Sequence, residues 1–361
     1  MSFQHAAPPD LTIAVVGATG AVGQEIVQVL AAWGVQSAQV GLFASERSAG
    51  IQVMTPWGER AVQAFDRAAV AAYDVVLLAV SGAFSQDIAP DLAAHGGVVI
   101  DTSSAFRYDP HVPLVVPEIN GKAAVQASLI ASPNCTTTLL VMVLWPLAVA
   151  FGLKKVLVST YQAASGAGTA GMCELEEQTQ AWFATNQAET GQAETGQAET
   201  GIFGHPLPFN IIPHIDTFQG NGYTREEMKV CWETRKVMDM PDLAVSCTAV
   251  RVPVRRAHAE SVVIETAQPV TVSAAREVLS RAPGVCLVDD PEARAYPMPL
   301  TASGRMDVEV GRLRHSLVFG AYGLEFFLCG DQLLKGAALN AVQIIDRLVG
   351  QRVLRKSRVL S

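Results

Sequence analysis

The chain has 361 residues, of which 50% are hydrophobic and 17% are charged, and this composition excludes a disordered chain. At about 150 residues per domain, the length predicts two domains. Lys and Arg number 26 and Asp and Glu number 34, which gives a net charge of −8. No dense basic run precedes Arg352–Arg358, so nucleic acid is not an expected partner.

The sequence contains no segment that predicts a membrane span or export. The longest apolar stretch, Leu139–Leu153, is interrupted by Pro146 and is too short to cross a bilayer. The first ten residues have neither a basic nor an apolar signal region. We therefore expect a cytoplasmic protein with no membrane partner.

The six cysteines are far apart and form no CxxC pair, so we expect neither a zinc site nor a redox dithiol. Scattered thiols in a large chain fit a reducing compartment. Five of them are interpreted as small buried hydrophobic residues, and Cys135 is the exception.

The first third of the chain alternates short apolar runs with helical patterns. Buried parallel strands separated by helices have this pattern, which predicts an α/β fold with a Rossmann-like, doubly wound domain over residues 1–133. The expected strands are Leu11–Val16, Gln39–Ala44, Asp74–Val80 and Gly97–Ile100, and the first expected helix is Gln24–Trp33.

After Pro133 the strand candidates become longer and the polar insertions between them are long. This predicts a second, α+β domain over residues 134–331 with a mixed or antiparallel sheet. An amphipathic pattern over Gln332–Val349 predicts a helix by which residues 332–361 pack back on the first domain. The expected strands are Lys155–Gln162, Leu243–Val254, Ser261–Thr266 and Leu313–Gly320.

One segment of the second domain is of low complexity. Gln187–Gly201 consists of QAETG three times in succession, which has no apolar face to bury. We interpret it as an exposed loop or a frayed helix extension without chemistry.

A glycine-rich turn follows the first expected strand and opens the first helix. Gly17–Gly23 has the spacing GxxGxxG, and glycines there let the backbone approach a pyrophosphate at the helix N-terminus. Tight strand–helix packing also selects glycine, but the position after a strand favours dinucleotide binding. The expected cofactor contacts are Gly17, Thr19, Gly20, Ala21 and Val22.

The end of the second expected strand bears on the choice of cofactor. Arg47 and Ser48 favour NADP, because a cation and a small hydroxyl suit a 2′-phosphate. Glu46 argues for NAD, although its side chain points away from Arg47 if the strand continues. A solvated loop is the alternative interpretation.

Cys135 lies just before the apolar helix Leu139–Val149. A helix N-terminus favours a thiolate and offers N–H groups to an oxyanion. A cysteine before a helix is by itself more often structural, so the neighbouring motifs decide between the two interpretations.

Several motifs together resemble the aspartate-semialdehyde dehydrogenase family over nearly the whole chain. Only the QAETG repeat is foreign to the family pattern. The motifs are, in order, GATGAVG at Gly17–Gly23, Ser45–Gly50, Ser103–Asn120, Asn134–Thr137, TYQAASGAG at Thr160–Gly168, Thr224–Lys236, RVPVRRAHAESV at Arg251–Val262 and Cys329–Ile344.

The resemblance implies reversible reduction of L-4-aspartyl phosphate by NADPH to L-aspartate 4-semialdehyde and phosphate. That reaction lies on the route to lysine, threonine, methionine and diaminopimelate. By the same resemblance Cys135 is the thiol that forms the acyl-enzyme, His258 the general acid/base, and Gln162 the amide that positions the substrate. It also implies a homodimer, or a tetramer made of two such dimers, with the contact on the second domain.

The chemistry independently requires these residue types. A thiolate can attack a carbonyl and later leave, and a histidine titrates near the pH at which a proton must move. A lone histidine is more often structural, but His258 follows the strand-like Arg251–Val254, which ends in basic residues.

A substrate with a carboxylate, an ammonium and a phosphate requires matching charges. Arg251 suits the carboxylate as a bidentate fork. Glu226 and Lys229 share a helix face, so Glu226 would hold the ammonium and Lys229 the phosphate together with Arg107. A surface ion pair is the usual alternative for such a string. The family pattern selects Glu226 over Glu227.

The resemblance assigns the remaining site residues. Asn134, beside the thiol, is a substrate contact, and Ser165, Gly166 and Gln332 are cofactor contacts at the nicotinamide end. Ala257 before the histidine and Ala259 after it depart from common family patterns, which puts local loop geometry in doubt rather than proton transfer.

The sequence argues against three other functions. N-acetyl-glutamyl-phosphate reductase would show Pro-Gly-Cys-Tyr, whereas this chain has Pro133–Thr136 with the sequence PNCT. The Ser-Cys-Thr-Thr-Asn motif of glyceraldehyde-3-phosphate dehydrogenase is absent. A non-catalytic paralogue would have lost the thiol or the proton carrier, and both Cys135 and His258 are present.

Overall fold

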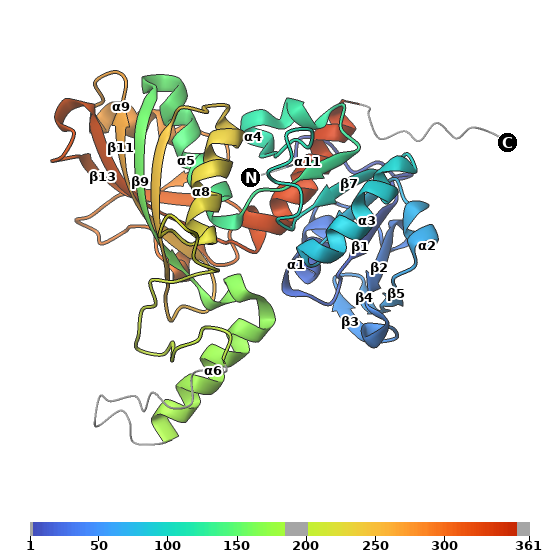
Figure 1. Cartoon of the computed structure of the whole chain (residues 1–361). Helices are drawn as coiled ribbons and strands as arrows, with labels where there is room; N and C mark the ends of the chain where they lie inside the picture. The colour runs from blue at the N-terminus through green and yellow to red at the C-terminus, as the bar shows by residue number, and fades with distance from the viewer. Residues whose placement is uncertain (1–2, 185–200, 352–361) are drawn as a thin grey trace. The chain divides into compact units, whose positions relative to one another are not determined.

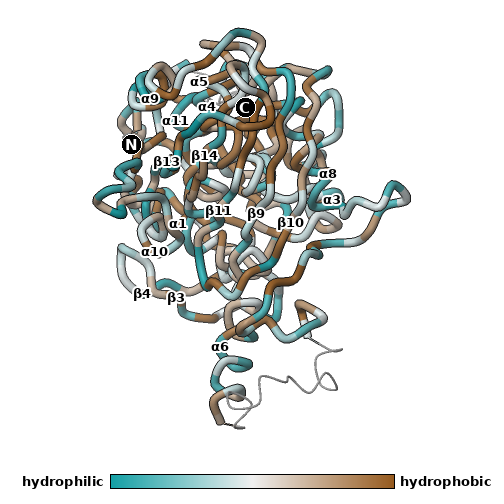
Figure 2. Tube along the Cα trace, turned by 90° about the vertical axis from the view of Figure 1, so that its left-hand side faces the viewer, coloured by the Kyte–Doolittle hydropathy of each residue, from teal (hydrophilic) through white to brown (hydrophobic). Residues whose placement is uncertain are grey.

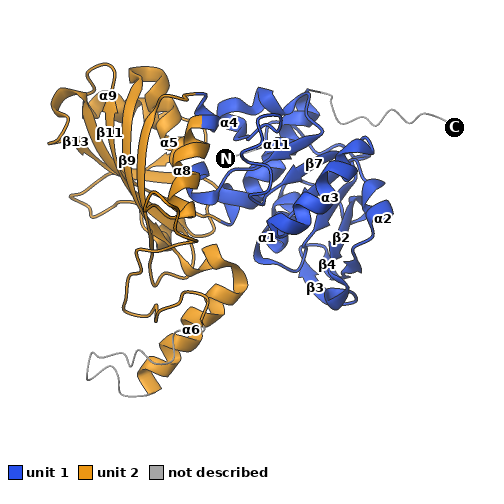
Figure 3. Ribbon diagram, in the orientation of Figure 1, with its two compact units in different colours: residues 1–138, 236–239, 333–361 blue, residues 139–235, 240–332 orange. Residues whose placement is uncertain are grey.

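The computed structural model describes residues 3–184 and 201–351, which form two compact units (Figure 3). Unit 1 comprises Met1–Thr138, Lys236–Asp239 and Leu333–Ser361, and unit 2 comprises Leu139–Arg235 and Met240–Gln332. Apart from Gly201, the QAETG repeat lies outside the described residues, as does the chain after residue 351.

Unit 1 contains a six-stranded, entirely parallel sheet of order β5-β2-β1-β6-β7-β8. The four inner strands are buried at every residue, and apart from Asp101 at the end of β7 they are continuously apolar rather than alternating. The Rossmann-like prediction is confirmed. The strands are β1 (Ile13–Val16), β2 (Val40–Ala44), β5 (Gln63–Ala64), β6 (Val75–Leu78), β7 (Val98–Asp101) and β8 (Leu129–Ala131), with a separate hairpin of β3 (Gln52–Thr55) and β4 (Gly58–Ala61).

Helices cover both faces of this sheet (Figure 1). On one face, Ile88 and Leu92 of α3 and Val70 of α2 join a core with the strand residues Val16 and Leu78. Helix α1 packs against α11, which begins after a turn of π-helix at Leu334–Ala338. The helices of unit 1 are α1 (Ala21–Ala32), α2 (Arg67–Ala71), α3 (Gly82–Ala94), α4 (Pro117–Asn120) and α11 (Leu339–Gly350).

Unit 2 contains a six-stranded mixed sheet of order β10-β9-β11-β14-β13-β12, as expected for the second domain. β9 pairs in parallel with β10 and antiparallel with β11, and β14 is antiparallel to both of its neighbours. Figure 2 shows β9, β10, β11, β13 and β14 of this sheet with each residue coloured by its hydropathy. The strands are β9 (Leu153–Gln162), β10 (Ala244–Arg251), β11 (His258–Thr266), β12 (Val285–Leu287), β13 (Val308–His315) and β14 (Gly323–Gly330).

Two sequence-based expectations for this sheet are wrong. A strand was expected at Leu313–Gly320, but β13 ends at His315, and β14 at Gly323–Gly330 was not expected at all. A bulge between Gly311 and Arg314 interrupts the alternation of β13, and charged residues within it hide the strand from a search for apolar runs.

The long helix α5 (Cys135–Phe151) is apolar on all sides and buried along most of its length, with Pro146 inside it. Helix α8 (Arg225–Met238) lies beside β10, where Cys231 Sγ donates to the carbonyl of Val245 and Arg235 Nε to that of Leu243. The division into units falls inside both helices. The others are α6 (Gly168–Ala184), α9 (Val272–Ser280) and α10 (Pro299–Ala302). No helix among the described residues is long and apolar enough to cross a membrane.

Candidate active site

The glycine-rich turn of unit 1 is closed so tightly that only glycine fits at two positions. Gly17 has φ +91°, and a Cβ there would lie 2.1 Å from the carbonyl oxygen of Ala79. A Cβ at Gly23 would lie 2.1 Å from the carbonyl oxygen of Gly17. Helix α1 then begins at Ala21 without a side-chain cap, so its first N–H groups remain for an anionic ligand.

The cavity at this turn has a volume of about 520 Å³, a size that suits part of a dinucleotide. The turn contributes three of the expected cofactor contacts to its wall, whereas Ala21 and Val22 are the first residues of α1. Its lining comprises Val16, Gly17, Thr19, Gly20, Ala44, Ser45, Glu46, Phe65, Ala79, Val80, Ser81 and Phe84. The residues present therefore fit a nucleotide phosphate at a helix N-terminus.

The segment after β2 does not continue as a strand. Glu46–Ser48 form a short 3-10 helix, so the condition under which Glu46 would point away from Arg47 is not met. Glu46 lines the cavity, whereas Arg47 and Ser48 do not. Arg47 is exposed.

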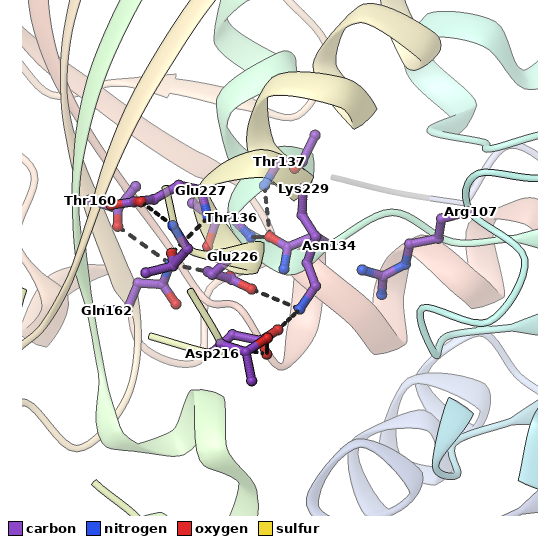
Figure 4. Close-up of polar contacts among 12 residues, drawn as sticks. Arg107, Asn134, Thr136, Thr137, Thr160, Gln162, Asp216, Glu226, Glu227 and Lys229 are labelled. Atoms are coloured by element: carbon purple, nitrogen blue, oxygen red, sulfur yellow. Dashed lines mark hydrogen bonds and ion pairs between the residues drawn. The ribbon is translucent and has the colours of Figure 1, made fainter. Parts of the chain in front are cut away.

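Cys135 is the first residue of α5 and is half-buried. Asn134 caps the helix, because its Oδ1 accepts from the backbone N–H of Thr136 at 2.9 Å and of Thr137 at 3.2 Å. The cap fixes the first turn of the helix, in which Cys135 is the first residue (Figure 4 shows Asn134 with Thr136 and Thr137). The structure thus shows Asn134 organising the segment that carries the thiol.

Arg107, also in unit 1, is held by the same segment. Its Nε donates to the carbonyl of Ser132 at 2.9 Å and its Nη2 to the carbonyl of Thr102 at 2.8 Å. The side chain is buried, and two backbone carbonyls therefore fix its direction. Ser132 lies three residues before Cys135, so Arg107 is tied to the backbone that leads to the thiol.

In unit 2, His258 is completely buried at the start of β11. Its Nδ1 accepts from the backbone N–H of Ala163 at 3.0 Å, so in the neutral ring Nε2 carries the proton. No described residue accepts a hydrogen bond from Nε2. The ring therefore presents an unused donor.

The protonation of His258 differs from the sequence-based expectation. Burial and then the charge of Arg251 lower the pKa of His258 to about 3, so in this state the ring does not titrate near neutral pH. The Arg251 and His258 side chains both pack closely against Gly166. A Cβ at Gly166 would lie 2.9 Å from Arg251 Nη1 and 3.1 Å from His258 Nε2. Arg251 donates to the carbonyl of Ala163 and lies over the ring of Phe203.

A polar chain crosses the other expected substrate residues of unit 2 (Figure 4). Gln162 Nε2 donates to Glu226 Oε1 at 3.3 Å, and Lys229 Nζ donates to Glu226 Oε2 at 3.1 Å. Arg251 is the register partner of Gln162 in the neighbouring strand. The structure thus brings together Gln162, Glu226, Lys229 and Arg251, which come from three separate segments of the chain.

Asp216 also belongs to this series of polar contacts, and the sequence did not predict it. Its Oδ2 accepts from Lys229 Nζ at 2.7 Å. Burial alone would lower the pKa of Lys229, but Glu226 and Asp216 outweigh it and raise that pKa. Burial likewise opposes ionisation of Asp216, yet its bond from Lys229 lowers the Asp216 pKa overall. Lys229 is therefore a permanent cation at neutral pH.

Gln332 joins the two loops beside His258. Its Oε1 accepts from the backbone N–H of Ala257 at 2.9 Å, and its Nε2 donates to Ser165 Oγ. Ala257 is in the left-handed region with φ +72°, which is strained for a residue other than glycine. The bond that the Ala257 N–H donates to Gln332 helps to hold the loop in that conformation. Ser165, expected as a cofactor contact, thus lies beside Gln332.

Comparison with known proteins identifies relatives of both units. A family model described as "Semialdehyde dehydrogenase, NAD binding domain" matches residues 12–127, and one described as "Semialdehyde dehydrogenase, dimerisation domain" matches residues 144–335. The aspartate-semialdehyde dehydrogenase of Bacillus subtilis (strain 168) is 44% identical over 340 residues, covering 94% of this chain and 97% of that protein. The Synechocystis protein of the same name is 43% identical over 345 residues, covering 95% and 98%.

Solved structures agree with these matches. The structure of aspartate semialdehyde dehydrogenase II from Vibrio cholerae has a TM-score of 0.85 at 38% identity and covers 94% of this chain and 98% of that chain. A second structure of that protein, complexed with ASA, matches equally well.

Proposed function

Because this chain belongs to the aspartate-semialdehyde dehydrogenase family of oxidoreductases, we propose that it reduces L-4-aspartyl phosphate reversibly to L-aspartate 4-semialdehyde and phosphate, with NADPH as the reductant. The product would supply the synthesis of lysine, threonine, methionine and diaminopimelate. The observation that carries the proposal is Cys135 at the first position of a helix capped by Asn134, where a thiolate and an adjacent oxyanion are both favoured.

The proposed reaction begins at the Cys135 sulfur. The thiolate attacks the acyl carbon, a C–S bond forms, the C–O bond to phosphate breaks, and phosphate leaves with its electron pair. NADP(H), held at the glycine turn of unit 1, would supply the hydride that reduces the resulting thioester. The tetrahedral oxygen takes up a proton, then loses it as the C–S bond breaks, which releases the aldehyde and regenerates the thiolate.

His258 supports this sequence as a donor at Nε2. That atom is buried and has no acceptor among the described residues, so a tetrahedral oxyanion would complete its hydrogen bonding. A substrate anion bound to Arg251 would offset the positive charge that helps to lower the pKa of His258. The histidine would thus become a better proton carrier when substrate binds.

The other polar side chains of the site match the charges of the substrate. Arg251 would bind the carboxylate and Glu226 the ammonium, while Lys229 and Arg107 would bind the phosphate. Gln162 would orient the acyl group, and its bond to Glu226 restricts its side chain. Ser165, Gly166 and Gln332 would contact the nicotinamide end of the cofactor.

We also infer a homodimer that forms through the outward face of the unit 2 sheet. Leu157 and Tyr161 are exposed on this face of β9, and the Tyr161 ring lies 6.0 Å from that of Phe327. The family model that covers this unit is named for dimerisation. Exposed apolar side chains on a sheet face favour association with another copy.

The proposal is tested by following nicotinamide absorbance with aspartate semialdehyde, phosphate and either NADP or NAD. We expect phosphate-dependent reduction of NADP, and no turnover by Cys135→Ala despite retained NADP binding. Replacing aspartate semialdehyde with N-acetylglutamate semialdehyde or glyceraldehyde 3-phosphate should abolish activity. Turnover without Cys135, or a preference for either alternative substrate, would contradict the proposal.

A further inference from the structure

A single lysine side chain closes the turn that carries Arg107. Lys236 is in the last turn of α8 and belongs, with the turn, to unit 1. Its Nζ donates to the backbone carbonyls of Arg107 at 2.9 Å, Asp109 at 2.7 Å and Val112 at 3.0 Å. An ammonium group has three N–H donors, and these three carbonyls match them in number.

The three carbonyls would repel one another without a cation between them. Each carries a partial negative charge, and they converge on one point although they come from a six-residue stretch. Three local bonds also lie inside the turn: Asp109 N donates to the carbonyl of Phe106, Val112 N to the carbonyl of Asp109, and His111 N to Asp109 Oδ1. Lys236 is therefore the contact from outside the turn that gathers its carbonyls.

Arg107 is thus held at both ends. The Lys236 ammonium fixes its main-chain carbonyl, while the carbonyls of Ser132 and Thr102 fix its guanidinium. A guanidinium binds a phosphate through a planar fork, so its affinity depends on orientation as well as charge. Displacing the turn would misdirect Arg107 without removing its charge.

We propose that Lys236 is a positioning residue for Arg107 and acts through it on the binding of the phosphate that leaves and enters in the reaction. This proposal rests on the proposed function, because it takes Arg107 to be a phosphate ligand. Lys236 itself donates to backbone carbonyls, so its effect is indirect. It predicts a defect confined to phosphate rather than a general loss of activity.

The first test is Lys236→Met, assayed in the oxidative direction with aspartate semialdehyde, NADP and varied phosphate. We expect KM for phosphate to rise about ten-fold, as when one charge-assisted contact is lost. KM for aspartate semialdehyde and for NADP should stay within about two-fold of wild type. Lys122→Met, which removes an exposed lysine of the same unit, is the matched control and should leave all three constants unchanged.

A double-mutant cycle distinguishes an action through Arg107 from an independent one. If Lys236 acts through Arg107, Lys236→Met combined with Arg107→Ala should have the same KM for phosphate as Arg107→Ala alone. Additive effects of the two substitutions would overturn the proposal. An equal rise in all three KM values would overturn it as well.

Binding without turnover gives a second readout. Inorganic phosphate should raise the melting temperature of the wild type, and Lys236→Met should require about ten-fold more phosphate for the same rise. Lys236→Gln, which keeps two N–H donors but no charge, should lie between the two. If both Lys236 variants fail to fold, the residue is structural and the proposal is wrong. An inactive wild type would refute the proposed function instead, whatever the variants do.

Discussion

His258 is a buried neutral histidine, and its protonation is coupled to the stability of the fold. Its pKa of about 3 in the folded chain lies below the usual value of 6.5, because burial and the Arg251 charge disfavour the imidazolium. As pH falls below 6.5 the unfolded chain takes up a proton at this site before the folded chain does. The free energy of unfolding must therefore decrease between pH 6.5 and pH 3.

We predict that His258→Gln removes this pH dependence. In the wild type, lowering the pH from 7.5 to 5 should cost roughly 2 kcal/mol of stability through this histidine alone. Urea unfolding at the two pH values should show the variant less sensitive to acid by that amount. His205→Gln, at an exposed histidine, should keep the wild-type pH dependence. Equal acid sensitivity in His258→Gln and the wild type would contradict the assigned protonation state.

Arg47 and Glu46 favour different cofactors, since Arg47 favours NADP and Glu46 favours NAD. Arg47→Ala should weaken NADP by roughly 1.5–3 kcal/mol, the strength of one charge-assisted bond to the 2′-phosphate, and should leave NAD nearly unaffected. Glu46→Gln should improve NADP relative to NAD, since Glu46 lines the cavity and its charge repels a phosphate. Dissociation constants for both cofactors test this. If Arg47→Ala weakens the two cofactors equally, Arg47 does not select between them.

Among the elements, α5 is stabilised by an N-terminal cap that can be recognised in the sequence. Asn134 precedes a run of apolar residues, and its Oδ1 satisfies two backbone N–H groups of the first turn. Asn134→Ala should therefore destabilise the fold by about 1 kcal/mol, whereas Asn134→Asp should keep the cap. The free energy of unfolding of the two variants checks this. Equal destabilisation by Ala and Asp would show that the cap contributes little.

Whether an element can be predicted depends on how clearly its own sequence identifies it. Buried parallel strands such as β1 and β6 were predicted because both faces are covered, so each strand is an unbroken apolar run. β14 was missed although its own sequence, GLEFFLCG, is a largely apolar run with one charged residue, Glu325, so a local signal for this strand is present.

The residues of the candidate site also differ in whether the sequence predicts them. Cys135, Gln162 and His258 stand in motifs that a family pattern identifies. Asp216 stands in none, because its role consists of one contact with Lys229 across a fold that joins distant segments. The lowered pKa of His258 likewise depends on burial and on Arg251. Neither can be predicted from the residues next to His258 in the sequence. Contacts between distant residues are what local patterns cannot contain.

At the scale of the whole molecule, the outward face of the unit 2 sheet governs the proposed assembly. We predict that Leu157→Glu converts the dimer into a monomer, since it places a charge on the exposed apolar face of β9. Met54→Glu, at an exposed apolar residue of unit 1, is the matched control and should leave the assembly unchanged. Sedimentation velocity measures the outcome. A Leu157→Glu dimer as stable as the wild type would place the interface elsewhere.

The discontinuity of unit 1 has a consequence for how the protein is made. Its parallel sheet is complete once Ala131 has been synthesised, but α11, which packs on α1, is translated only after the whole of unit 2. A nascent chain on the ribosome therefore carries the nucleotide-binding sheet with one helix missing while unit 2 emerges. During that interval the surface of α1 that α11 will cover is open to chaperones and to misassembly. Ribosome stalling before residue 339 should consequently release a chain that has every strand of both sheets and yet is a substrate for proteolysis.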